Sequence, residues 1–346
     1  MTSVPPPFEH PARPELPEGL PPERIPKDEP PPSGLPDWPL WAPFAAMLVT
    51  LGIAILGVSI VALAASVAGV DVNADDPPPG VTIAGTFIQD GALIFSALLL
   101  ARMTAGRPTP WQFGLRRVRL GLAVGWVAAV WFAFLLFSGI WAAALQITEN
   151  DDLPQELGAD ESTAALVAVA VLVCVAAPIA EELFFRGFCF TALRRRIGVI
   201  GGAVATGVIF GLIHAGSADA VFLVPLAFFG AALCLLYHRT GSLLPCMVLH
   251  ALNNSLALGV SQSWAVGEVV ALMAAAATVV VALALPFSRA VGSPVNPIAS
   301  RRCARSKLAG VAVAKSATPS CGARSLLSAP FPASYAPTLK AWPIAR

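Results

Sequence analysis

The stretch AAPIAEELFFRGFCFTALRRR, from Ala176 to Arg196, decides the fold of this chain. It places two adjacent carboxylates, Glu181 and Glu182, and the guanidinium of Arg186 inside strongly apolar sequence. Ionisable side chains are rare in membrane-spanning segments because burying a charge in hydrocarbon is costly, and those that occur usually mark a functional site. The Glu181–Glu182 pair is therefore the first candidate for such a site.

The composition excludes an ordinary soluble domain, in which about 25% of residues are charged. Of the 346 residues, 56% are hydrophobic and 12% are charged, and the mean hydropathy is +0.72. Apolar runs of about 20 residues recur along the chain, and this is the length that crosses a hydrocarbon core of roughly 30 Å. The predicted fold class is therefore all-α, a polytopic membrane helical bundle.

Eight apolar runs are long enough to cross a membrane. They cover about 40–69, 81–101, 120–145, 163–193, 198–214, 220–237, 242–259 and 264–287. Arginines follow the second, fourth, sixth and eighth runs, whereas Asp and Glu gather after the first, third and fifth. Because Lys and Arg mark cytoplasmic loops, this alternation predicts eight transmembrane helices with both termini in the cytoplasm. The expected location is the cell membrane, as a multi-pass protein.

Two tails are expected to flank the helical domain. Residues 1–39 are rich in Pro and Glu, a composition that predicts a disordered leader. Residues 289–346 contain Lys and Arg but no Asp or Glu, and we expect a basic, disordered tail. The membrane domain is then residues 40–288, with a functional core at about 160–260.

Polar and aromatic residues recur at helical spacing on three of the expected spans. The pairs four residues apart are Glu182 and Arg186, Phe210 and His214, and His250 and Asn254. Residues four apart share one face of a helix, so each span presents a single polar stripe to the bundle interior. At 1.5 Å per residue, Glu181, His214 and His250 lie about 17–20 Å from the arginine-rich ends of their spans. A carboxylate, two imidazoles and a carboxamide are thus expected in one layer.

This combination of groups suits peptide hydrolysis, which needs a base for water and donors for the developing oxyanion. Glu181 can act as the base, and His214 can share the water or shuttle the proton. His250 and Asn254 can donate hydrogen bonds to the oxyanion. Glu182 is instead expected to pair with Arg186 one turn away, with Phe210 as a further supporting residue.

Taken singly, these features have simpler explanations. A Glu–Arg pair can be a structural ion pair, a histidine near a helix end can be a cap, and an asparagine in a membrane helix often bonds to a neighbouring helix. Their joint occurrence at one depth favours a catalytic or ion-conducting site.

The motifs Glu181-Glu182-x-x-x-Arg186, Phe210-x-x-x-His214 and His250-x-x-x-Asn254 resemble the pattern of the CPBP family of intramembrane proteases. This family includes type II CAAX prenyl endopeptidases and bacterial abortive-infection (Abi) and bacteriocin-immunity proteins. The resemblance implies an eight-helix bundle with a cavity open to the cytosol and the lipid. It also implies that Glu181 and His214 activate the water and that His250 and Asn254 stabilise the oxyanion.

The resemblance raises the question of a metal, because the family has also been described as metalloproteases. The chain has no His-Glu-x-x-His motif, so a water activated by glutamate without a cofactor is the preferred interpretation. If the reaction depends on a metal, zinc bound by Glu181, His214 and His250 is the alternative.

The sequence therefore predicts an intramembrane endopeptidase that cleaves a membrane-associated protein or peptide, with prenylated CAAX-type proteins as one substrate class. The expected partners are this substrate and the lipid bilayer, and not nucleic acid. Two other functions stay open. One is a non-enzymatic immunity or scaffold protein that binds through the same pocket, and the other is a proton-coupled transporter.

Overall fold

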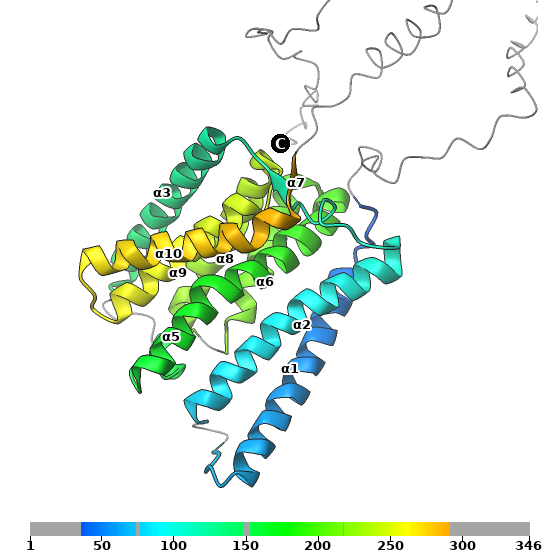
Figure 1. The fold of residues 1–346 in the computed structure, drawn as a ribbon. Coiled ribbons are helices and arrows are strands. Elements are labelled where there is room, and N and C mark those ends of the chain that lie inside the picture. The colour runs from blue at the N-terminus through cyan, green and yellow to red at the C-terminus, as the bar shows by residue number, and fades with distance from the viewer. Residues whose placement is uncertain (1–35, 74–76, 148–152, 217, 291–346) are drawn as a thin grey trace, which may run out of the picture. The chain divides into compact units, whose positions relative to one another are not determined.

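The computed structural model describes residues 36–73, 77–147, 153–216 and 218–290. Most of them are helical (Figure 1). The long α-helices are α1 (Ala42–Val67), α2 (Pro79–Ala105), α3 (Leu120–Leu145), α7 (Thr191–Ile213), α8 (Ala220–Thr240), α9 (Leu244–Ser261) and α10 (Val266–Ala284). The short elements are β1 (Arg116–Arg117), α4 (Leu153–Glu156), α5 (Thr163–Val171), α6 (Ala177–Glu181), the π-helices η1 (Leu172–Ala176) and η2 (Glu182–Phe190), the 3-10 helix η3 (Leu285–Phe287) and β2 (Arg289–Ala290).

The predicted helical membrane bundle is confirmed, and the protein is an integral membrane protein. Within the described ranges, seven helices are long and apolar enough to cross a membrane, one fewer than expected. The difference lies in one helical segment, Thr163–Ile213, which is 51 residues long and runs from α5 to the end of α7. Gly198 interrupts it with φ 77° and ψ 175°, a backbone conformation that only glycine adopts readily. The fourth and fifth expected spans are the two arms of this segment.

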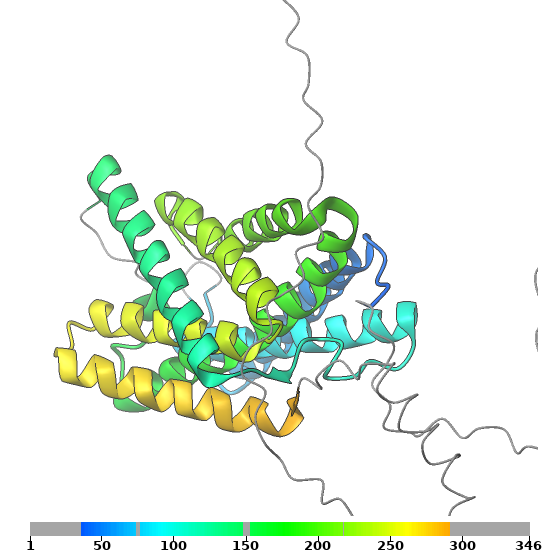
Figure 2. The same cartoon turned by 90° about the horizontal axis from the view of Figure 1, so that it is seen from above.

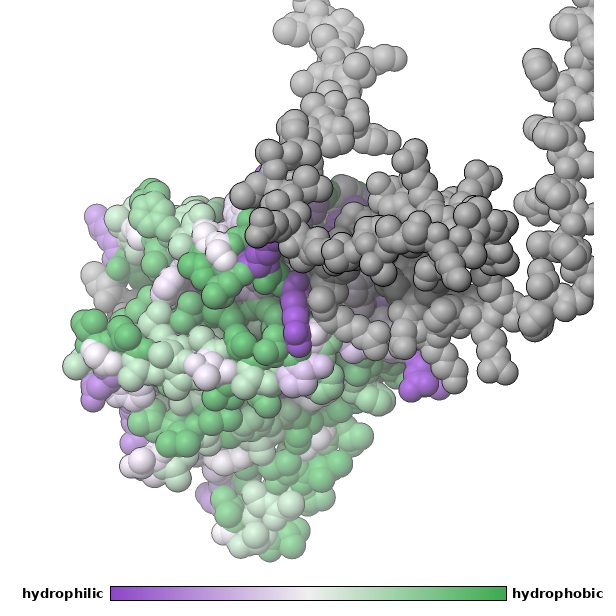
Figure 3. Space-filling view, turned by 45° about the horizontal axis from the view of Figure 1, so that its top comes forward, coloured by the Kyte–Doolittle hydropathy of each residue, from purple (hydrophilic) through white to green (hydrophobic). Residues whose placement is uncertain are grey.

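The helices pack as antiparallel neighbours. The pairs α1–α2, α7–α8 and α9–α10 make the most extensive contacts, and α3 packs on α8. Viewed from two directions, α1 and α2 lie at one side of the bundle and α3 at the other (Figures 1 and 2). Hydrophobic residues cover most of the described surface that Figure 3 shows. This outward-facing apolar surface is what a bilayer requires, because the hydrocarbon offers no partner for polar groups.

One end of the bundle carries the arginines and brings together distant parts of the chain. Arg116 of β1 pairs with Arg289 of β2 in a short parallel ladder. Trp38, which the sequence had assigned to the disordered leader, is 1% exposed, and its ring centroid lies 5.0 Å from that of Phe113 in a tilted arrangement. The first and last described residues therefore lie at the same end, as an even number of crossings requires. Residues 1–35 and 291–346 of the two expected tails lie outside the described residues, and the disorder predicted for them stays a prediction.

Glycines allow α7 and α8 to approach closely beside the site. A Cβ added at Gly211 would lie 2.6 Å from the carbonyl oxygen of Leu223, and one at Gly207 would lie 2.5 Å from that of Ala227. Small residues four apart are a common means of packing membrane helices without a hydrophobic driving force. This contact holds Phe210 and His214, at the end of α7, against α8.

Candidate active site

The carboxylate pair sits where the helix changes its winding. Glu181 ends α6, and Glu182 begins the π-helix η2, while another π-helix, η1, precedes α6. Pro178 lies at the start of α6 and has no backbone N–H to donate. π-Helical turns are rare and occur often at functional sites. The rise of 1.5 Å per residue used for the depth of Glu181 therefore does not hold throughout this helix, and the two neighbouring carboxylates face different surroundings.

Glu182 lies at the centre of a fully buried network. Its Oε1 accepts a hydrogen bond from Arg186 Nη1 at 2.7 Å, and neither side chain is exposed. Arg186 Nη2 donates to the carbonyl of Gly230 in α8 at 3.2 Å, and its guanidinium lies 4.6 Å from the ring of Phe210. The same Glu182 oxygen lies 2.8 Å from Nδ1 of His250. The expected Glu182–Arg186 pair is thus present, and it also holds a ring from α9.

Glu181 occupies the other side of this network and faces a cavity. Its side chain is 13% exposed, and its Oε2 lies 3.9 Å from Nε2 of His250. Among the described residues, Oε2 of Glu181 has no hydrogen-bond partner. Because Arg186 already balances Glu182, Glu181 is the less neutralised carboxylate.

His214 enters the same cavity from the end of α7. Its Nδ1 lies 2.7 Å from the carbonyl oxygen of Phe210, so Nδ1 carries the proton and donates it. In the neutral ring, Nε2 is then the acceptor, which is the form a base or a water-binding group needs. The Phe210 ring lies between the two imidazoles, with centroids 4.9 Å from His214 and 6.0 Å from His250.

Asn254 completes the set one turn beyond His250 on α9. Its Nδ2 donates to the carbonyl of Val173, in η1, at 2.8 Å. A carboxamide has a second N–H, so one donor is still available after this bond. Glu181, Phe210, His214, His250 and Asn254 all line one cavity of about 480 Å³. The structure therefore brings together every residue that the sequence had placed in one layer.

The segment that carries these motifs also matches a known family. Residues 163–256 match the family model described as type II CAAX prenyl endopeptidase Rce1-like. Over these residues the chain is similar to the CAAX protease family. Neither the curated proteins nor the solved structures that were searched gave a match to the chain. The matched segment contains all three motifs, from Glu181 to Asn254, and supports a CAAX protease-type enzyme.

One acidic residue of the cavity was not predicted from the sequence. Asp90, from α2, lines the cavity with Glu181 and is 5% exposed. Its Oδ2 has no hydrogen-bond partner among the described groups. The signal in the sequence was an aspartate in the middle of an otherwise apolar run, which is unusual enough to indicate function. A second missed signal was the pair Gly207 and Gly211, which positions the end of α7.

The cavity lies toward the end of the bundle that is opposite the arginines. Its lining includes Pro154 and Leu157, from the α4 region, and Gly216 and Ala218, from the loop between α7 and α8. These two loops belong to the acidic set in the sequence. The opening to the cytosol that the resemblance implies stays a prediction.

The described residues do not include a ready-made metal site. In the described part of the chain, no group of three His, Cys, Asp or Glu side chains is arranged to hold a metal ion. Nδ1 of His214 donates to a carbonyl and Nδ1 of His250 lies beside Glu182, so each ring is oriented through Nδ1. Zinc on Glu181, His214 and His250 stays an alternative, and no step below is derived through a metal.

Proposed function

We propose that the protein is an intramembrane endopeptidase that hydrolyses a peptide bond in a membrane-associated protein or peptide. The observation that carries this proposal is Glu181 Oε2, an unpartnered carboxylate oxygen in a cavity shared with His214, His250 and Asn254. The family match supports the same reaction class. It gives no comparable support to an immunity, scaffold or transport function.

In the proposed first step, the Glu181 carboxylate takes a proton from a water as the water oxygen attacks the peptide carbonyl carbon. Nε2 of His214 holds the water through its lone pair. The C=O π bond opens as the new C–O bond forms, and the electron pair goes to the carbonyl oxygen. The product is a tetrahedral oxyanion beside a protonated Glu181.

The oxyanion is stabilised by two donors from α9. Asn254 supplies its second N–H, and His250 supplies Nε2–H when its ring carries both protons. In the second step the C–N bond breaks, the oxyanion re-forms a carbonyl, and Glu181 returns its proton to the leaving nitrogen.

Glu182 and Arg186 are positioning residues in this scheme. Their ion pair fixes the orientation of His250 through Nδ1, while the contact to Gly230 fixes η2 against α8. A buried pair of this kind contributes mainly to the geometry of the site, since its net effect on stability is often small.

We further propose that the substrate reaches the cavity from the non-cytoplasmic side or from the bilayer. Under the positive-inside rule, the loops near Pro154 and Gly216 face away from the cytoplasm, because the arginines lie at the other end. A prenylated CAAX-type substrate is a cytosolic protein and would meet the arginine-rich end. A membrane-embedded peptide or protein segment is therefore the favoured substrate class.

The test is a cleavage assay on purified protein in detergent, with prenylated and unmodified membrane peptides as substrates. Cleavage is expected to fall at least about 1,000-fold in Glu181→Gln, and about 100-fold or more in His214→Ala. The matched control Glu161→Gln changes an exposed carboxylate at the same end of the bundle and should cleave normally. Equal cleavage by all four proteins would overturn the proposal.

A further inference from the structure

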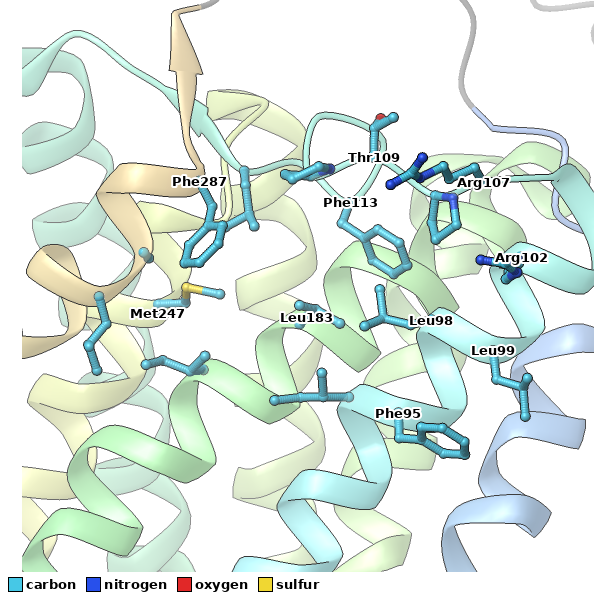
Figure 4. Close-up of a pocket in the computed structure, with 17 residues that line it drawn as sticks. Phe95, Leu98, Leu99, Arg102, Arg107, Thr109, Phe113, Leu183, Met247 and Phe287 are labelled. Atoms are coloured by element: carbon cyan, nitrogen blue, oxygen red, sulfur yellow. The ribbon is translucent and has the colours of Figure 1, made fainter.

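A second, larger pocket opens on the outside of the bundle. It has a volume of about 830 Å³ and is lined by α2, the loop after it, α6, η2, α9 and the end of α10 (Figure 4). Its floor is buried, since Phe113 and Met247 are each 1% exposed. Its rim is open, since Phe95 is 54% and Phe287 60% exposed. Exposed apolar side chains on a membrane bundle face hydrocarbon, so this pocket opens sideways into the bilayer.

Two arginines stand at one edge of this apolar pocket. Arg102, from the last turn of α2, and Arg107, from the following loop, both lie at its upper edge in Figure 4. The described lining contains no Asp or Glu, and neither arginine makes an ion pair among the described residues. Guanidinium groups bind phosphate through paired hydrogen bonds. The pocket thus joins an apolar interior to a positively charged rim.

The pocket is separate from the cavity that contains Glu181. No residue lines both. Along the helix that carries the carboxylate pair, Ile179 and Leu183 face this pocket, whereas Ala177 and Glu181 face the cavity. A peptide that reacts at Glu181 therefore does not fill this pocket, and a different ligand is needed to account for its shape.

We propose that the pocket binds one anionic glycerophospholipid from the leaflet at the arginine-rich end. The phosphate lies between Arg102 and Arg107, and an acyl chain lies against Phe95, Leu183 and Met247. The volume is within the range of about 300–1,000 Å³ that is usual for ligand pockets. The position of the rim fits an anionic lipid as well. The arginine-rich end is the predicted cytoplasmic end, and anionic lipids of the cytoplasmic leaflet attract basic residues. The bound lipid would support the back of the helix that presents Glu181.

The test titrates the purified full-length protein with phosphatidylglycerol or phosphatidylcholine in mixed micelles and counts bound lipid by native mass spectrometry. Wild-type protein should bind one phosphatidylglycerol more tightly than phosphatidylcholine. The double variant R102Q/R107Q should bind phosphatidylglycerol about 30-fold more weakly, since each arginine near an anionic lipid contributes about fivefold. The matched control R117Q/R196Q removes two exposed arginines outside the pocket and should change binding by less than about threefold.

Two further variants test the acyl-chain site and the independence of lipid binding from the active site. Leu98→Trp fills the pocket without changing charge and should also weaken binding of phosphatidylglycerol. Glu181→Gln should leave it unchanged, so a failed cleavage assay and a failed lipid assay are distinguishable. The proposal is overturned if R102Q/R107Q and R117Q/R196Q lose the same affinity for phosphatidylglycerol, or if Leu98→Trp binds this lipid as wild type does. It is overturned as well if wild type binds the two lipids with equal affinity. It is also overturned if a farnesylated peptide occupies the pocket independently of Arg102 and Arg107.

Discussion

Replacing Glu182 with glutamine separates the roles of the two adjacent carboxylates. Glu182 is fully buried, and one of its oxygens binds both Arg186, at 2.7 Å, and His250, at 2.8 Å. Glutamine keeps the size but removes the charge, so the buried guanidinium loses its counterion. Breaking a buried ion pair in this way costs about 3–5 kcal/mol. For a domain of this size, we expect the melting temperature to fall by about 6–20 °C.

Glu181→Gln should behave in the opposite way. Its side chain faces the cavity and has an oxygen without a hydrogen-bond partner among the described residues, so the loss of charge removes little stabilisation. We expect the free energy of unfolding to change by less than about 1 kcal/mol, while cleavage is lost. Glu161→Gln, on the surface, is the control for both measurements.

The chain contains its own reporters for this assay. Cys174, Cys189, Cys234 and Cys246 are buried free thiols, so a thiol-reactive dye labels them as the protein unfolds on heating. The double variant E182Q/R186M should lose less stability than Glu182→Gln and Arg186→Met lose together, because neither buried charge is then left unpaired. If Glu182→Gln unfolds at the wild-type temperature, or Glu181→Gln loses as much stability, then the proposed division between the two carboxylates is wrong.

Three other predictions follow from single contacts. Asp90→Leu should raise the free energy of unfolding by about 1–3 kcal/mol, because an apolar group of similar size replaces a buried carboxylate oxygen that has no described partner; a melting curve checks this, and the cleavage rate of the variant should fall below that of wild type. Gly211→Leu should destabilise the α7–α8 contact by about 1–3 kcal/mol, whereas Gly139→Ala, which meets nothing within 4 Å, should not, and equal melting temperatures would contradict the close packing. In a C303S/C321S background, Ala215→Cys should react with a membrane-impermeant maleimide on intact cells and Arg117→Cys only after permeabilisation; the reverse order would place the cavity on the cytoplasmic side.

Much of this architecture could be predicted because it depends on local sequence. Span length, the alternation of arginines with acidic loops, and the three i, i+4 pairs each depend on residues that are near one another in the chain. They predicted the helical bundle and the shared cavity of Glu181, His214, His250 and Asn254. The sequence did not predict that the fourth and fifth spans form one helical segment. Gly198 departs from helical backbone geometry there without separating the two helices by a loop.

The parts that sequence could not predict depend on contacts between distant residues. His250 binds Glu182 across 68 positions, so its Nδ1 is held by a carboxylate that had been assigned to Arg186 alone. Trp38 is buried only because Phe113 and Phe188 lie beside it, although its own surroundings in the sequence are rich in proline. The π-helical turns around the carboxylate pair were also not predicted, because the residue spacing was interpreted with regular α-helix.

The central claim is that Glu181 activates water for peptide hydrolysis, and terminal proteomics tests it most directly. Membranes from cells that carry the wild-type protein, Glu181→Gln or Glu161→Gln are compared by mass spectrometry of protein N- and C-termini. The expected result is a set of new termini in membrane-associated proteins that appears with wild type and Glu161→Gln and is missing with Glu181→Gln. The same new termini in the Glu181→Gln cells would contradict the claim.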